Sequence, residues 1–289
     1  MKVSGFTFIR NAVLYDYPVV ESISSILTLC DEFIVAVGKS DDNTRELIAS
    51  MTSPKIKIID TVWDESIKEG GAVLAEETNK ALEAISSEST WAFYIQADEV
   101  IHEQYLQRLI MDMEKYKGDV GVEGLLLDFV HFYGSYDYIG ASRNWYRKEV
   151  RVIRNDRQIR SYRDAQGFRK NGRPLIVQPV EATVYHYGWV KPPEFQQAKQ
   201  QYFNTLWHDE KWIAEHIAPG ETFDYSRIDA LDKFTGTHPL VMKNRIEQKN
   251  WHFSFDPSGK RLSLVKRFLH FIEQTTGWRP GEYRNYRIM

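Results

Sequence analysis

The sequence has little cysteine and no long hydrophobic run. Cys30 is the only cysteine among 289 residues, which excludes an intramolecular disulfide framework and a multi-cysteine zinc site and is typical of a reducing compartment. Because cysteine packs like a small hydrophobe, we expect Cys30 to be buried rather than nucleophilic. No run of about 18 apolar residues occurs, and the N-terminus lacks the apolar stretch of a signal peptide. We therefore expect a cytoplasmic protein.

The chain also lacks a strong charge of either sign. Its 37 basic and 40 acidic residues leave a net charge of -3, too close to neutral for a general nucleic-acid or anionic-membrane binder, so any basic function must be local. A composition of 43% apolar and 27% charged residues is typical of a folded protein and excludes disordered and collagen-like classes. The length predicts either one large domain or a domain with a helical appendage. We expect a catalytic domain over residues 1–190 and a mainly helical extension over residues 191–289.

Short apolar runs alternate with helical patterns over the first 115 residues. The runs predict strands at 3–9, 33–37, 56–59 and 91–95, with helices from Pro18, from near Asn43 and over 71–86. Repeated βαβ units require a parallel sheet covered by helices. Such sheets bind ligands beyond the carboxyl ends of their strands. Arg10, Ser40 and Asp98 each follow a strand, so we expect them at one edge of the sheet.

The later part of the chain differs in charge. We expect strands within 121–138 and 176–184, a helix from Pro193 through Glu215 and an amphipathic helix over 262–273. The stretch 143–173 carries 11 Lys or Arg against 3 Asp or Glu. It is either a solvated face or a folded basic surface for a polyanion such as a diphosphate.

Two segments contain residues that suit a metal ion. The strand 91–95 ends in Gln96-Ala97-Asp98-Glu99, and paired carboxylates at the mouth of a sheet suit Mg²⁺ or Mn²⁺. The same pair also suits the first turn of a helix, which favours negative charge. His186 lies among aromatic residues beside Gly188. It is either a packed, hydrogen-bonded histidine or a metal ligand.

Three ordered segments resemble the signatures of family 2 glycosyltransferases with the GT-A fold. They are Arg10-Asn11, the stretch 30–44 and the segment 96–99. Two departures stand out. Val37-Gly38 replaces the acidic residues that usually hold the nucleotide base, which leaves the donor base open. Gln96 replaces the first aspartate of the Asp-x-Asp signature, while Asp98 keeps the position of the expected metal ligand.

The resemblance implies a fold, a reaction and a set of site residues. The fold is α/β, with a mostly parallel GT-A sheet flanked by helices, and the reaction is metal-dependent transfer of a sugar from a nucleotide-diphospho-sugar to an acceptor hydroxyl, with inversion. Asp98 and His186 would hold Mg²⁺ or Mn²⁺. Asp164 would be the catalytic base, with Glu181 and Asp128 as rivals. The donor would contact residues after the first two strands, some of which also suit helix caps: Arg10, Gly38, Lys39, Ser40 and Asp42.

The acceptor is less well defined. Similarity to the family implies a glycan or lipid-linked acceptor in cell-surface polysaccharide or glycolipid synthesis, with no nucleic-acid partner. Residues 251–289 are aromatic and basic, so they either pack on the catalytic domain or contact a membrane. Two other readings stay open. One is a non-catalytic nucleotide-sugar or glycan-binding protein, and the other is a metal-dependent sugar nucleotidyltransferase, which normally has a glycine-rich loop that residues 5–12 lack.

Overall fold

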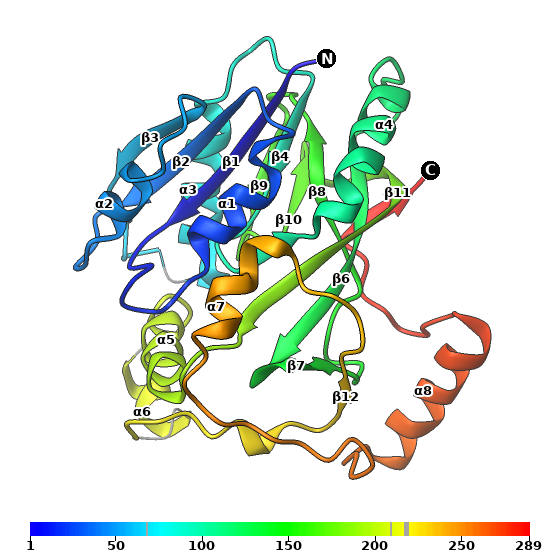
Figure 1. The fold of residues 1–289 in the computed structure, drawn as a ribbon. Coiled ribbons are helices and arrows are strands. Elements are labelled where there is room, and N and C mark those ends of the chain that lie inside the picture. Colours follow the sequence, from blue (N-terminus) through cyan, green and yellow to red (C-terminus); the bar gives the residue numbers. More distant parts are fainter. Residues whose placement is uncertain (68, 209, 217–219) are drawn as a thin grey trace.

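The N-terminal half is a parallel sheet with helices on its faces. The computed structural model describes residues 1–67, 69–208, 210–216 and 220–289 (Figure 1). Four parallel strands lie in the order β3-β2-β1-β4. They are β1 (Val3–Ile9), β2 (Glu32–Gly38), β3 (Ile56–Thr61) and β4 (Trp91–Tyr94), and the connecting helices are α1 (Val19–Leu27), α2 (Thr44–Ala49), η1 (Glu69–Gly71) and α3 (Ala72–Glu83). The α/β fold predicted from the alternating pattern is confirmed.

Beyond β4 the sheet becomes mixed. The described strands form one 13-stranded sheet that continues in the order β8-β6-β11-β10-β9. The strand direction reverses at β8, which is antiparallel to both of its neighbours, β4 and β6. β6 and β11 are parallel to each other. The elements of this part are β5 (Glu99–Ile101), η2 (Glu103–Tyr105), α4 (Leu106–Tyr116), β6 (Gly124–Tyr133), β7 (Ser135–Gly140), β8 (Lys148–Arg154), β9 (Ile159–Tyr162), β10 (Gly167–Lys170) and β11 (Arg173–Trp189).

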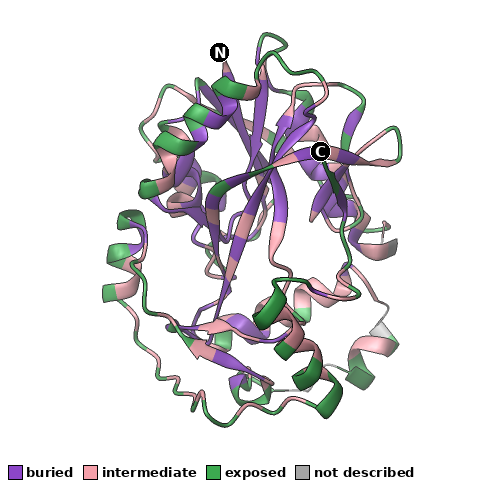
Figure 2. Cartoon of the chain, turned by 90° about the vertical axis from the view of Figure 1, so that its right-hand side faces the viewer, coloured by how far each residue is buried: buried purple, intermediate pink, exposed green. Residues whose placement is uncertain are grey.

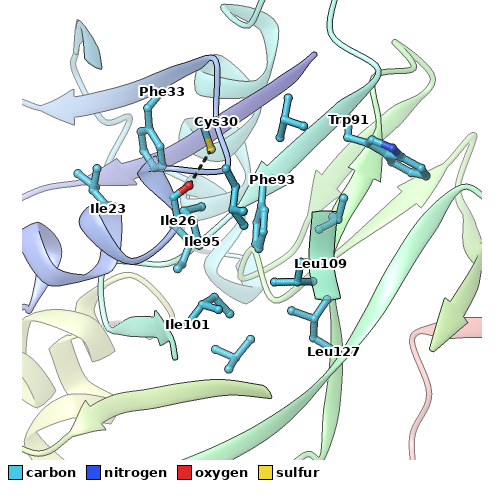
Figure 3. Packing of buried hydrophobic residues seen from close by; sticks show 14 of the residues in the cluster. Ile23, Ile26, Cys30, Phe33, Trp91, Phe93, Ile95, Ile101, Leu109 and Leu127 are labelled. Atoms are coloured by element: carbon cyan, nitrogen blue, oxygen red, sulfur yellow. Dashed lines mark hydrogen bonds between the residues drawn. The ribbon is translucent and has the colours of Figure 1, made fainter. Parts of the chain in front are cut away.

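One core cluster lies between the sheet and α1, and a second includes Ala81 and Leu82 of α3. Ile23 and Ile26 of α1, Phe33 of β2 and Phe93 of β4 are fully buried in one cluster (Figure 3). Cys30 belongs to the same cluster, and its Sγ donates a hydrogen bond to the Ile26 carbonyl at 3.3 Å. Burial raises the pKa of the Cys30 thiol to about 12. The expectation of a buried packing cysteine is confirmed.

The C-terminal part is joined to the same sheet. It contains α5 (Pro193–Thr205), α6 (Glu210–His216), η3 (Tyr225–Arg227), β12 (Leu231–Lys233), η4 (Leu240–Met242), α7 (Lys243–Glu247), α8 (Leu264–Thr276) and β13 (Tyr286–Ile288). β12 pairs with β7, and β13 pairs with β11. The mainly helical extension expected over residues 191–289 is therefore not confirmed, because two strands and extended segments tie this part to the sheet.

Burial is uneven over the chain. Buried residues concentrate in the sheet, while the periphery of the C-terminal part is exposed (Figure 2). The described helices include none that is both long and apolar enough to span a bilayer.

Candidate functional site

A cavity of about 440 Å³ opens at the carboxyl edge of the parallel strands. β1, the loop after β3 and the segment after β4 supply one wall, and α5 with the residues that follow it supplies the other. The polar and charged residues of the lining include Arg10, Gln96, Asp98, Asp164, His186 and Lys199. The edge of the sheet predicted to bind a ligand is thus hollowed.

Strand pairing brings Asp98 and His186 together. β5 follows Asp98 directly and is antiparallel to β11, with Glu99 opposite His186. The Tyr187 backbone N–H also donates to the Asp98 carbonyl at 2.7 Å. The result is a distance of 3.7 Å between His186 Nε2 and Asp98 Oδ1. Gly188 keeps this space open, because a Cβ there would lie 2.6 Å from Asp98 Oδ2 and 2.7 Å from His186 Nε2.

The hydrogen bonds of His131 fix the tautomer of His186. His131 Nε2 lies 2.8 Å from the Tyr146 carbonyl, which can only accept, so this nitrogen carries the proton. Burial lowers the pKa of His131 well below its usual range, so its Nδ1 has a free lone pair. His186 Nδ1 lies 3.1 Å from that Nδ1 and must be the donor. Burial also lowers the pKa of His186, which leaves an unprotonated Nε2 facing Asp98.

Asp98 is a buried carboxylate close to two lysines. Burial by itself would raise the pKa of Asp98, but the positive charges of Lys199 and Lys191 hold it well below the usual range. Lys199 Nζ lies 3.2 Å from Asp98 Oδ2 and donates to the Gly188 carbonyl at 3.0 Å. Asp98 is therefore ionised at neutral pH, with Lys199 on one carboxylate oxygen and His186 near the other.

This pair of donors fits a divalent cation. Two lone-pair atoms, Asp98 Oδ1 and His186 Nε2, face each other with no proton between them, and carboxylate and imidazole are both ligands of Mn²⁺ and related ions. Within the part of the chain that the structure describes, no group of three or more His, Cys, Asp or Glu residues could hold a metal ion. Further ligands would have to come from the substrate or from water.

Glu99 plays a different part from Asp98. Both oxygens of Glu99 accept hydrogen bonds from Arg151 at 2.7 Å, and both side chains are fully buried. Glu99 begins β5, so the interpretation of the carboxylate pair as a helix cap is wrong. The Gln96 amide donates toward the Tyr94 hydroxyl and the Ala165 carbonyl, each at 3.3 Å. The two residues beside the candidate metal ligand therefore hold the loop in place.

Asp164 lies on a strained turn in the cavity wall. Its neighbours Arg163 and Ala165 have φ values of 52° and 61°, a conformation that costs non-glycine residues of order 1 kcal/mol each and often occurs at functional sites. Burial raises the pKa of Asp164, although backbone N–H groups of Asp164 and Gln166 oppose the shift. A raised pKa makes the carboxylate a better proton acceptor.

The two rival bases lie elsewhere. Glu181 is 81% exposed and pairs with Arg108 at 3.1 Å, while Asp128 pairs with Lys148 across β6 and β8. Neither lines the cavity. Of the three candidate bases, the structure brings only Asp164 to the cavity that holds Asp98 and His186.

Arg10 and Trp63 line one side of the cavity. The Arg10 guanidinium lies near the rings of Trp63 and Tyr202, at 5.7 and 5.5 Å from their centroids, and pairs with Glu65 at 2.5 Å. The Trp63 indole packs directly over Gly38, where a Cβ would clash with it. The absence of a side chain at Gly38 thus makes room for a tryptophan.

The other predicted donor contacts hold loops. Ser40 Oγ accepts from the Asn11 backbone N–H at 3.1 Å and donates to the Gly38 carbonyl at 2.8 Å. Asp42 accepts from the backbone N–H groups of Leu14 at 2.7 Å and Thr44 at 2.9 Å. Ser40, Asp42 and the exposed Lys39 do not line the cavity. Their role as donor ligands stays a prediction.

The second wall of the cavity was not predicted. Lys199 and Tyr202 on α5 and Trp207 after it line the cavity, although we assigned every site residue to the first 190 positions. The aromatic spacing 202, 203 and 207 was an available signal. Three buried N–H donors of the cavity lining, Arg10 Nε, Trp63 Nε1 and Trp207 Nε1, have no hydrogen-bond partner among the described residues. Unpaired buried donors are costly, and these three nitrogen atoms have almost no surface accessible from the cavity.

Comparisons with known proteins bear on the fold. No family model and no curated protein matches this sequence. Among solved structures, S. aureus TarS is 13% identical with a TM-score of 0.41, over 76% of this chain and 41% of TarS. Glucosyl-3-phosphoglycerate synthase from Mycobacterium tuberculosis, in complex with Mn²⁺, UDP and glucosyl-3-phosphoglycerate, is 18% identical with a TM-score of 0.32, over 46% of this chain and 45% of that one.

A third similar structure has a different activity in its name. It is the 4-diphosphocytidyl-2C-methyl-D-erythritol synthase from Anaerococcus prevotii, 13% identical with a TM-score of 0.32, over 53% of this chain and 71% of that one. None of these likenesses reaches a TM-score of 0.5. This chain spans less than half the length of the TarS chain that it matches. The substrates and activities in these names belong to those proteins.

Proposed function

We propose that this protein is an inverting glycosyltransferase that moves a sugar from a nucleotide-diphospho-sugar to an acceptor hydroxyl. One observation carries the proposal: an unprotonated His186 Nε2 faces the ionised Asp98 across 3.7 Å in a cavity that also contains Asp164. This arrangement combines a cation-binding pair with a carboxylate of raised pKa, which are the two parts that the reaction needs.

The donor side of the cavity suits a diphosphate. Asp98 and His186 would hold a divalent cation, which when bound neutralises charge on the leaving nucleotide diphosphate. Lys199 and Arg10 supply further positive charge in the cavity. Because aromatic side chains such as Trp63, Tyr202 and Trp207 line the cavity, these interactions are stronger than they would be in water.

Asp164 would act on the acceptor. Its carboxylate takes the proton from the acceptor hydroxyl as the oxygen attacks the anomeric carbon on the face opposite the diphosphate. The C–O bond to the diphosphate breaks as the new glycosidic bond forms, which inverts the configuration. Burial keeps the pKa of Asp164 above its usual value, nearer to what a base needs at neutral pH.

Transfer assays test this proposal. UDP-, GDP- and dTDP-sugars are offered with Mn²⁺ or Mg²⁺ and a panel of glycan acceptors, and the anomeric configuration of the product is read by NMR. Asp98→Ala should abolish metal-dependent turnover, and Asp164→Asn should retain donor binding and lose transfer. Full activity of both variants would contradict the assignment. Glu221→Ala, at an exposed carboxylate that does not line the cavity, is the control and should keep wild-type activity.

Two other functions give different outcomes. A non-catalytic binding protein would bind a nucleotide-sugar together with a metal ion held by Asp98. It would neither hydrolyse the nucleotide-sugar nor transfer its sugar. A sugar nucleotidyltransferase would release pyrophosphate from a nucleoside triphosphate and a sugar phosphate, which a pyrophosphate assay detects directly. The segment from Gly5 to Ala12 has no glycine-rich phosphate loop, so we favour sugar transfer.

The cellular setting is part of the proposal. We place the reaction in the cytoplasm, in cell-surface polysaccharide or glycolipid synthesis, with a glycan or lipid-linked acceptor. A reducing compartment agrees with the lone, buried Cys30. Fractionation of cells that produce the full-length protein, followed by an acceptor assay on each fraction, tests the location.

A further inference from the structure

The apolar face of α8 points away from the protein. Leu264, Val265, Phe268 and Phe271 are 82%, 68%, 63% and 61% exposed, and α8 has no buried residue. Trp278, just beyond the helix, is 62% exposed. α8 stands at the periphery, apart from the parallel strands (Figure 1). Exposed apolar patches of this kind mark interaction sites.

The polar side of α8 attaches it to the body of the protein. Glu273 pairs with Arg143 at 3.0 Å, with Arg147 at 3.3 Å and with Arg279 at 3.5 Å. Lys266 lies seven residues, or about two helical turns, before Glu273, which places it on the same side of the helix. Lys266 pairs with Asp229 at 3.3 Å. An amphipathic helix normally buries its apolar stripe and exposes its polar one. α8 has the opposite orientation, because ion pairs hold its polar side against the protein and leave its apolar side exposed.

The sequence of α8 up to Ile272, with the segment before it, is basic. Residues 257–272 contain four basic residues, Lys260, Arg261, Lys266 and Arg267, and no acidic residue. Lys260 and Lys266 pair with Asp232 and Asp229, whereas Arg267 is exposed and forms no ion pair within the described part of the chain. An apolar face flanked by cations is complementary to an anionic lipid surface.

We propose that the α8 face, defined as Leu264, Val265, Phe268, Phe271 and Trp278 with Arg267, docks the protein on the surface of an anionic membrane. Thirteen residues rise about 20 Å, too short to span a bilayer of about 30 Å, so the helix lies in the interface. A second copy of the chain is the less suitable occupant. Five such side chains offer roughly 500–600 Å², below the about 800 Å² per partner of a standard interface, and two copies would oppose like charges.

Vesicle binding by the full-length protein tests this inference. The protein is sedimented with phosphatidylcholine vesicles that contain or lack phosphatidylglycerol. We expect binding to the anionic vesicles, weakened at least about tenfold in neutral vesicles or in high salt. The double variant Phe268→Ser/Phe271→Ser should lose at least about tenfold in binding. Arg267→Gln should lose several-fold. Val120→Ser, at a 90% exposed valine elsewhere on the surface, is the matched control.

Several outcomes would overturn the inference. Equal vesicle binding by the double variant and the wild type would show that the α8 face is not the contact. Absence of vesicle binding, together with a dimer in analytical ultracentrifugation that the double variant abolishes, would identify a second copy as the occupant. Circular dichroism melting of each variant confirms folding, since every substituted side chain is mostly exposed. No donor or acceptor is present, so the result is independent of the proposed sugar transfer.

Discussion

The parallel sheet and α8 are both apolar in sequence but differ in how they are used. β1 has six buried residues of seven, and its Phe6 is fully buried. α8 carries an amphipathic pattern with a continuous apolar face, and it has no buried residue. In the sheet, side chains on both faces meet helices, whereas α8 meets the body through Glu273 and Lys266. Periodicity therefore shows that a surface is apolar, and the surrounding structure decides what covers it.

The largest effect that we expect is on the free energy of unfolding, when the buried Arg151–Glu99 pair is compared with an exposed ion pair. Replacing Arg151 by Leu leaves Glu99 buried without a partner, so we expect a loss of about 3–5 kcal/mol in the free energy of unfolding. Arg160 pairs with Glu83 on the surface, with both side chains about half exposed. Arg160→Leu should therefore change stability by less than about 1 kcal/mol. Urea denaturation of both variants measures the difference, and equal losses would contradict it.

Truncation of apolar side chains compares the two regions directly. Ile23→Ala removes a fully buried side chain from the core and should cost about 3 kcal/mol. Phe268→Ala on α8 should change the unfolding free energy by no more than about 0.5 kcal/mol. Thermal and urea melting measure both. A large loss on truncation of Phe268 would show that α8 is packed in solution and that the α8 face is covered by the chain itself.

Glu149 links the C-terminal strand region to the sheet and should make stability depend on pH. It accepts hydrogen bonds from Gln166 at 2.8 Å and Asn285 at 2.9 Å. Burial raises its pKa from 4.5 to about 8. Between these values the native state holds one proton more than the unfolded state, so the stabilising contribution is complete below pH 4.5 and is lost as the pH rises to about 8.

The slope of that dependence is measurable. Glu149 should lower the unfolding free energy by about 1 kcal/mol per pH unit over this window. Glu149→Gln keeps the shape of the side chain and cannot ionise, so its stability should be less dependent on pH than that of the wild type and higher at pH 8. Urea denaturation at pH 5, 6.5 and 8 tests this expectation. An identical slope in both proteins would mean that Glu149 titrates normally.

The smallest effect that we expect is a change in Mn²⁺ affinity when Lys199 is replaced. Its ammonium group already occupies Asp98 Oδ2, so it competes with any other cation for that carboxylate. Lys199→Met should bind Mn²⁺ without nucleotide about tenfold more tightly, equivalent to about 1.4 kcal/mol. Electron paramagnetic resonance of free Mn²⁺ measures this. Lys211→Met, at an exposed position on α6, is the control, and unchanged Mn²⁺ affinity in Lys199→Met would contradict the competition.

Much of the fold follows from local patterns. The predicted strand 3–9 and the strands near 33, 56 and 91 occur with ends within two residues of those predicted, because short apolar runs between polar loops leave few alternatives. The edge position of Arg10 and Asp98 follows from parallel topology alone. The mixed part of the sheet was harder, since β11 and its partners are set by long-range pairing rather than by local sequence.

The candidate site was predicted in part. Asp98, His186, Asp164 and Arg10 line one cavity, whereas Ser40 and Asp42 are engaged in loop hydrogen bonds. Polar residues after a strand suit a ligand and a helix cap equally well, and sequence spacing does not separate the two uses. Lys199 and Tyr202 were missed because they belong to a helix more than 90 residues after Asp98 in the chain.

The sequence by itself determined the alternating α/β core, the burial of Cys30 and the order of the polar loops, because these depend on residue type and on local periodicity. Only the tertiary structure decided which polar side chains meet. It set the register of β5 against β11 that brings His186 to Asp98, the His131 hydrogen bond that fixes the tautomer of His186, and the position of Lys199. It also decided that α8 would expose its apolar face, because ion pairs on the opposite side fix the orientation of the helix.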